Sequence, residues 1–93
     1  MIYRAKPVLV LAEQVSRRAY ESTEHEAARV RKALGITDRQ HICGGGLLGH
    51  IMVGDQTARP TDWVVALPDS DLKVLSDSLF RLLFAPAGTV ATP

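Results

Sequence analysis

The sequence predicts an α+β domain in which one amphipathic helix packs on a curled antiparallel sheet or partial barrel of about five to six short strands. Three observations support this fold class: one capped segment with helical periodicity, several short extended runs between turn signals, and a length of 93 residues. A chain of this length normally builds one hydrophobic core. We therefore expect a single domain over residues 1–84 and a flexible tail of small residues and prolines over residues 85–93.

The first expected strand is the apolar run PVLVLA at residues 7–12. Its shortness and its β-branched residues favour a buried strand over a helix. The run is too short for a signal peptide or a membrane span, so we expect a cytoplasmic protein without membrane association. The single cysteine excludes an internal disulfide framework and suits a reducing compartment.

The expected helix spans about residues 24–34. Thr23 and Glu26 have the spacing of a capping box, and the glycine after the helix can adopt the left-handed conformation that ends many helices. Three apolar residues recur at positions i, i+3 and i+7 of this segment: Ala27, Val30 and Leu34. Such a narrow apolar stripe is typical of a helix that packs on one face of a sheet.

The remaining strands are expected between turn signals. Residues 36–43 form one extended run, and residues 54–55 (Gly-Asp) separate two short runs in the manner of a two-residue hairpin. Residues 63–67 form the next run, and the turn residues at 68–71 connect it to an alternating segment. Residues 76–84 favour a single helical turn followed by a terminal strand.

The segment CGGGLLGH, residues 43–50, has the G-x-G-x-x-G spacing of dinucleotide-binding loops at Gly44, Gly46 and Gly49. That fingerprint requires a strand before it, a helix after it and an acidic residue about 20 positions later. The residues that follow predict a strand instead, and Asp69 lies in a turn. We therefore expect a flexible hairpin connection. Leu47 and Leu48 lie either against the core or exposed at its tip, where they would suit a partner or a second copy.

His41, Cys43 and His50 form the one cluster with the chemistry of metal ligands. His41 and Cys43 would share a face of a strand, and a hairpin could bring His50 opposite them. Structural zinc normally has four ligands, and only His25 remains. No third group is present to orient a base for Cys43. We therefore expect no metal site, no cofactor and no thiol nucleophile.

The formal net charge is +1, from 11 basic and 10 acidic residues, which argues against a dedicated nucleic-acid binder. Basic residues concentrate in the first half of the chain and acidic residues in the second. This polarity could steer a charged partner or favour self-association, and the alternative is two solvated faces. The residues that we expect at a partner-binding surface are Leu47, Leu48, Arg17, Arg18, Arg29 and Lys32.

Two segments resemble a known family. The start of the chain matches a Tyr-Arg-x-Lys-Pro-Val-x-Val-x-Ala pattern at Tyr3, Arg4, Lys6, Pro7, Val8, Val10 and Ala12. A later segment contains Pro60, Asp62, Trp63, Phe80 and Phe84. Both segments resemble the PGDYG-like family of small phage and prophage proteins, over roughly half of the chain. That family has glycine where this chain has Thr61. Because a β-branched residue resists positive φ, we expect a type I turn there, and we expect Trp63 in the core.

The resemblance implies a phage or prophage origin, and therefore a protein that acts on a component of the host. Since the sequence contains no catalytic constellation, we expect a small non-enzymatic accessory protein that binds a host macromolecule, and inhibition of that macromolecule is one way in which it could act. The expected partner is a host protein, and a homodimer is compatible with the sequence. The alternative is a small-molecule or nucleotide-binding module that uses the glycine-rich loop at residues 43–50. A structural component of the virion is a third hypothesis.

Overall fold

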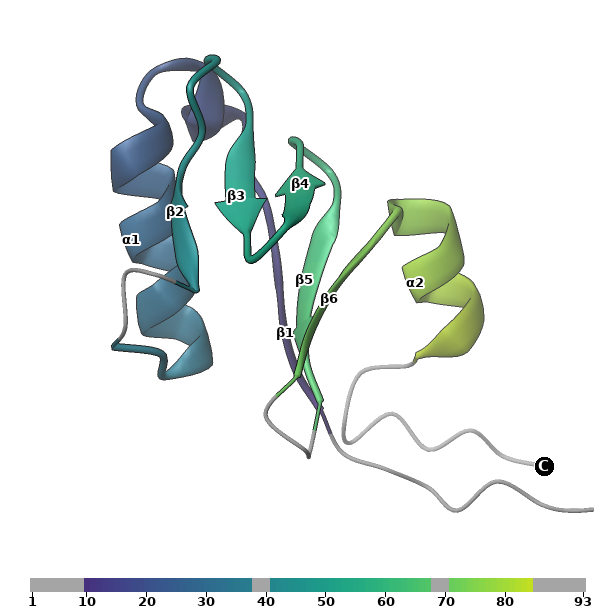
Figure 1. Ribbon diagram of the computed structural model, residues 1–93. Helices are drawn as coiled ribbons and strands as arrows, with labels where there is room; N and C mark the ends of the chain where they lie inside the picture. Colours follow the sequence, from purple (N-terminus) through teal and green to yellow (C-terminus); the bar gives the residue numbers. More distant parts are fainter. Residues whose placement is uncertain (1–9, 38–40, 68–70, 85–93) are drawn as a thin grey trace, which may run out of the picture.

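The computed structural model describes residues 10–37, 41–67 and 71–84 (Figure 1). The elements in chain order are β1 (Leu11–Gln14), the 3₁₀ helix η1 (Arg17–Tyr20), α1 (Thr23–Leu34), β2 (Ile42–Gly44), β3 (Ile51–Val53), β4 (Gln56–Ala58), β5 (Trp63–Ala66), β6 (Leu72–Leu75) and α2 (Asp77–Leu83). The described residues form an α+β fold, as expected. The start of the expected first strand, at 7–9, and the expected tail at 85–93 lie outside the described residues.

The strands form two antiparallel sheets of three strands each, with the orders β1-β5-β6 and β2-β3-β4. The first sheet is central. The second sheet and α1 lie on one side of it, and α2 lies on the other (Figure 1). The single curled sheet or partial barrel is therefore not confirmed, because the sheets are separate in their backbone pairing and do not close. The expected hairpin at Gly54 and Asp55 is present, since Val53 lies opposite Gln56 and Gly54 has a φ of +60°.

The side-chain amide of Gln56 connects the two sheets. Its Nε2 donates to the Leu72 carbonyl at 3.0 Å, and its Oε1 accepts from the Val74 amide at 3.0 Å. The amide therefore takes the place of a peptide group between β4 and the edge strand β6. Each such hydrogen bond contributes about 1 kcal/mol, so the two sheets are held together at this point without forming one ladder.

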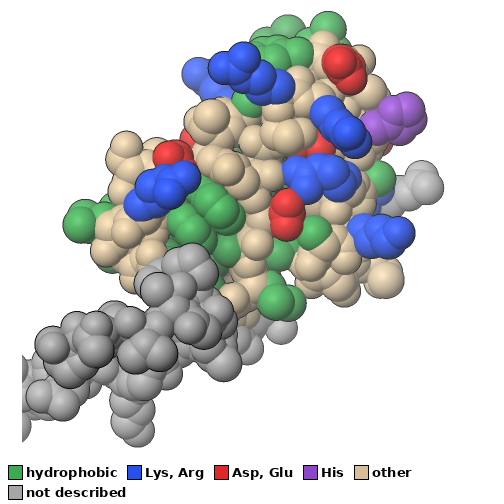
Figure 2. Space-filling view, turned by 180° about the vertical axis from the view of Figure 1, so that it is seen from behind, with side chains coloured by type: hydrophobic (Ala, Val, Ile, Leu, Met, Phe, Trp, Pro, Cys, Tyr) green, Lys and Arg blue, Asp and Glu red, His purple; other side chains and the backbone are tan. Residues whose placement is uncertain are grey.

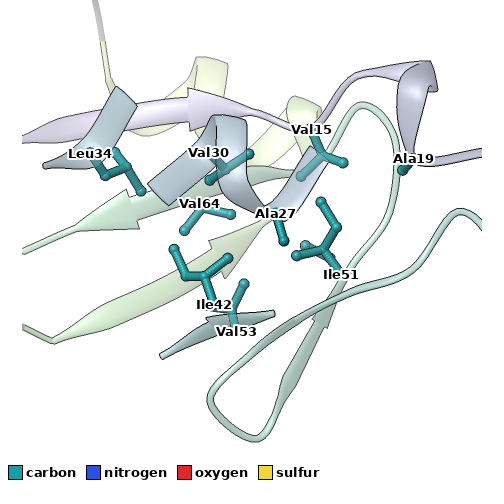
Figure 3. Close-up of a cluster of buried hydrophobic side chains, with 10 residues drawn as sticks. Val15, Ala19, Ala27, Val30, Leu34, Ile42, Ile51, Val53 and Val64 are labelled. Atoms are coloured by element: carbon teal, nitrogen blue, oxygen red, sulfur yellow. The ribbon is translucent and has the colours of Figure 1, made fainter. Parts of the chain in front are cut away.

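The main hydrophobic core lies between α1 and the two sheets (Figure 3). Its buried residues are Val15, Ala19, Ala27, Val30, Leu34, Ile42, Ile51, Val53, Ala58 and Val64. The apolar stripe of the expected helix contributes Ala27, Val30 and Leu34, so the predicted packing face is confirmed. Val65 is also buried but lies outside this cluster. Because side chains alternate along a strand, Val65 faces the α2 side of the central sheet together with Trp63.

The start of α1 differs from the expected capping box. The cap is Ser22, whose hydroxyl accepts from the His25 amide at 3.3 Å, and Thr23 is the first helical residue. Serine caps a helix as well as threonine does. Because Glu26 does not bond back to the cap residue as in a capping box, its carboxylate is available for contacts in the interior. The end of the helix is as expected, since Gly35 has a φ of +70°.

The expected terminal strand is replaced by α2. Ser76 caps this helix by accepting from the Leu79 amide at 3.2 Å. Trp63 is half-buried on the α2 side of the central sheet, and this corrects its expected place in the core. Its ring stacks on Phe80 with centroids 3.9 Å apart, and Phe80 stacks on Phe84 at 5.2 Å. The aromatic rings therefore fasten α2 to the sheet.

The turn before β5 is of type II, which corrects the expected type I turn. The Asp62 amide donates to the Arg59 carbonyl at 2.9 Å across Pro60 and Thr61, and Thr61 has a φ of +80°. The Thr61 amide also donates to the Val15 carbonyl at 2.9 Å. This long-range hydrogen bond holds the threonine in a conformation that glycine adopts more readily.

We expect Thr61→Gly to stabilise the protein by about 1 kcal/mol, because glycine adopts positive φ without the steric cost of a β-branched side chain. Thr57→Gly is the matched control, since Thr57 is exposed within β4 and has no positive φ. That variant should lose about 0.5–1 kcal/mol. Urea denaturation of both variants checks the prediction, and a loss of stability in Thr61→Gly would contradict it.

Candidate functional site

The β2–β3 hairpin and η1 lie together at one end of the molecule (Figure 1). The hairpin narrows where the Gly45 amide donates to the His50 carbonyl at 2.8 Å, and the His50 amide donates to the Leu47 carbonyl at 3.2 Å. The Gly49 amide donates to the Ala19 carbonyl of η1 at 2.8 Å. Ala19 is itself fully buried in the core. The hairpin tip is therefore attached to the body of the protein through η1.

Close packing explains two of the glycines in this hairpin. A Cβ on Gly45 would lie 2.4 Å from the His50 carbonyl oxygen. Gly49 has a φ of +84°, and a Cβ there would lie 2.7 Å from the ring of Tyr20. The loop joins two antiparallel strands, and no helix follows it. A dinucleotide-binding loop leads into a helix N-terminus, and this loop leads into a strand instead. The expected hairpin connection is therefore confirmed.

The tip exposes apolar side chains next to cationic ones. Leu47, Leu48 and Tyr20 are 67%, 65% and 59% exposed, and Arg17 and Arg18 are exposed on η1. We call these five residues the tip surface. Over the described part of the chain, neither arginine side chain has an ion pair. Figure 2 shows Lys and Arg side chains beside hydrophobic ones at the upper end of the molecule.

Arg29, which we expected at a partner-binding surface, belongs to an internal network. Its guanidinium donates to Glu26 at 2.6 and 2.9 Å, to the Glu13 carboxylate at 2.6 Å and to the Gln14 carbonyl at 2.7 Å. The side chain of Glu26 is fully buried and also accepts from the Ser16 amide. Burial alone would raise the pKa of Glu26, but the hydrogen bonds from Arg29 and Ser16 outweigh burial and lower it. The carboxylate of Glu26 in turn raises the pKa of Arg29.

The other sequence candidates do not join the tip surface. Lys32 is exposed one turn after Arg29 on α1, which runs away from the tip (Figure 1). His41 precedes β2 and is exposed, Cys43 is half-buried opposite Met52, and His50 precedes β3. Within residues 10–37, 41–67 and 71–84, no group of three or more His, Cys, Asp or Glu side chains is placed to hold a metal ion.

A hollow of about 360 Å³ lies at the end of the molecule opposite the tip, between the end of α1 and the strands β5 and β6. It is lined by Leu34, Ile36, Thr37, His41, Ala66, Leu67 and Leu72. The lining is mostly apolar and borders the two internal segments that the structure does not describe. We therefore assign no ligand to this hollow.

Sequence reasoning did not place Tyr20 at the tip. The one local signal was Ser16, which caps η1 by accepting from the Arg18 amide at 3.3 Å and so predicts a helical turn at this point. The contact between Gly49 and Tyr20 joins residues 29 positions apart, and no local pattern indicates it. Only the folded chain brings the aromatic ring to Gly49, the residue that follows the two leucines.

No helix in the described part of the chain is long and apolar enough to cross a membrane. In comparisons with known proteins, no family model, no curated protein and no solved structure matches this chain.

Proposed function

We propose that this protein is a small non-enzymatic phage or prophage accessory protein that binds a host protein through the tip surface. The observation that carries this proposal is the pair of exposed leucines, Leu47 and Leu48, held at a hairpin tip near Arg17 and Arg18, which form no ion pair within the described residues. Inhibition of the bound host protein, in the bacterial cytoplasm, is part of the proposal.

The tip surface has the composition of a recognition surface. Tyrosine and arginine are enriched among residues that dominate binding energy, and full burial of one leucine is worth about 1.5–3 kcal/mol. The attachment of Gly49 to Ala19 holds the surface in place before binding, which lowers the entropic cost of association. The complementary surface on the partner would have an apolar pocket for the leucines and carboxylates for the two arginines.

The residues that carry the family resemblance support a phage or prophage origin. Trp63, Phe80 and Phe84 stack on one another, so these positions act as one structural unit. Thr61 takes a left-handed conformation at the position where the family has glycine. Cys43 is half-buried and unpaired with another cysteine, which suits a reducing compartment.

The proposal predicts that the double variant Leu47→Glu, Leu48→Glu loses host-protein binding by at least about 30-fold, the equivalent of about 2 kcal/mol. The new carboxylates would face the acidic groups of the partner and could not enter an apolar pocket. Affinity purification from bacterial lysate with quantitative mass spectrometry identifies the protein retained by the wild type. Calorimetry with that purified protein then measures both dissociation constants.

Leu11→Glu is the matched control, because Leu11 is 60% exposed and lies on β1, outside the tip surface. This variant should bind like the wild type. Equal retention of the host protein by the tip variant and by the control would refute the proposed surface, and retention of no host protein by the wild type would refute the proposed function. A rise in melting temperature on addition of nucleotides would favour the nucleotide-binding alternative instead.

A further inference from the structure

The apolar side chains of α2 form two neighbouring sets, one aromatic and one of leucines. Phe80 and Phe84 form one face and dock on Trp63. The rotation of the helix about its axis is fixed by Asp77, which accepts from the Trp63 indole at 2.9 Å and from the Gln14 amide at 3.3 Å. The leucines of α2 are therefore held in their exposed position and cannot turn toward the sheet.

The exposed set on α2 consists of leucines. Leu79, Leu82 and Leu83 are 40%, 79% and 58% exposed, and as i, i+3 and i+4 neighbours they form one arc of the helix surface beside the two phenylalanines. We call these three residues the leucine face. Single exposed leucines are common, but three on one arc of a helix form a contiguous apolar patch. Three neighbouring exposed leucines on a helix of 7 residues indicate a surface that another molecule covers.

Charge distinguishes the leucine face from the tip surface. The charged side chains of α2 are Asp77 and Arg81, and the Arg81 Nε donates to both carboxylate oxygens of Asp77 at 3.0 Å. The leucine face therefore has no unpaired charge, and its complement must be apolar and uncharged. Another copy of the same face meets that requirement. Contact between the tip surfaces of two copies would place the arginines of one copy against those of the other. Repulsion between these like charges opposes such a contact.

We propose that this protein forms a symmetric homodimer in which the leucine faces of two α2 helices pack against each other across a two-fold axis. A two-fold contact uses the same surface on both copies, which fits a face without charge polarity. The contact goes beyond the proposed function and does not depend on it. The tip surface lies at another part of the molecule and stays accessible, so a dimer presents two tip surfaces and gains avidity.

The size of the leucine face sets the strength of this dimer. A helix of 7 residues is about 10 Å long, so the contact is smaller than the roughly 800 Å² per partner of a standard interface. Small contacts of this kind are typical of weak complexes. We therefore expect an equilibrium between monomer and dimer that depends on concentration.

Sedimentation velocity of the full chain, from about 10 μM to about 1 mM, tests the proposal. The wild type should shift from monomer to dimer over this range, and Leu82→Glu should stay monomeric throughout. Leu82 is largely exposed, so its replacement changes the free energy of unfolding by less than about 0.5 kcal/mol. Leu48→Glu is the matched control, and it should dimerise like the wild type.

A wild type that stays monomeric, or a Leu82→Glu variant that still dimerises, would overturn the proposal. The proposal would also be overturned if Leu82→Glu and Leu48→Glu changed the monomer–dimer equilibrium by the same amount. Deletion of residues 85–93 tests the other candidate for covering the face, which is the end of this chain. If only the shortened chain dimerises, that segment covers the leucine face and the proposed dimer of the full chain is wrong.

Discussion

Replacement of Glu26 by alanine should lower the free energy of unfolding by about 3 kcal/mol, measured by urea denaturation. The buried carboxylate accepts hydrogen bonds from Arg29 and from the Ser16 amide. Its removal leaves these donors without their acceptor and opens a cavity under α1. Because the side chain of Arg29 is 33% exposed, water compensates part of the loss, and we expect the lower end of the range for broken buried ion pairs.

Glu24→Ala is the control for this prediction, because Glu24 is exposed on the same helix. It should change stability by less than about 1 kcal/mol, the size of a helix-dipole effect. A loss in Glu26→Ala no larger than that of the control would show that the network does not stabilise the fold.

The same network predicts how stability changes with pH. The folded pKa of Glu26 lies below its ordinary value of 4.5. The stabilisation is therefore fully present above that ordinary value and is lost as the pH falls through the folded pKa. Glu26→Gln removes the titrating group, so its stability should fall less steeply than that of the wild type below about pH 5. Parallel profiles for the two proteins would contradict this expectation.

The Glu26 network also positions the proposed binding surface. Ser16, whose amide donates to Glu26, is the residue that caps η1, and η1 carries Arg17, Arg18 and Tyr20. The carboxylate therefore fixes the start of the 3₁₀ helix from the interior of the protein. For this reason Glu26→Ala should weaken host-protein binding in addition to lowering stability.

Gly45→Ala should destabilise the protein by about 2 kcal/mol, whereas Gly46→Ala should be neutral or stabilising by up to about 1 kcal/mol. A methyl group on Gly45 would lie 2.4 Å from the backbone carbonyl of His50, which cannot move away without breaking the hairpin. A methyl group on Gly46 has no atom within 4 Å, and this glycine has no positive φ. The alanine at position 46 also restricts the unfolded chain, which favours folding.

Thermal and urea denaturation of the two alanine variants, which differ only in position, check this pair of expectations. If both variants lose stability equally, the hairpin does not follow the path described. If Gly46→Ala alone is destabilised, the glycine spacing has a role other than hairpin geometry.

The sequence alone determined the elements whose signals are local. The stripe of Ala27, Val30 and Leu34 predicted the packing face of α1, and Gly35 predicted its end. Gly54 predicted the β3–β4 hairpin. In each case the hydrogen bonds and steric preferences involved join residues a few positions apart, so a short window of sequence contains the whole cause.

The tertiary structure decided the features that depend on distant residues. Phe80 and Phe84 are four positions apart, a spacing that shares a face in a strand and in a helix alike, and the stacking of Phe80 on Trp63 adds to the Ser76 cap in favouring the helix. The Val15 carbonyl holds Thr61 at positive φ.

The candidate site depended on distant contacts in the same way. The buried carboxylate of Glu26 holds the half-buried Arg29 in an ion-pair network, and the hydrogen bond between Gly49 and Ala19 holds the hairpin with the exposed Leu47 and Leu48 beside η1. These contacts form only when the chain is folded, because their energies come from partners that are not neighbours in the sequence.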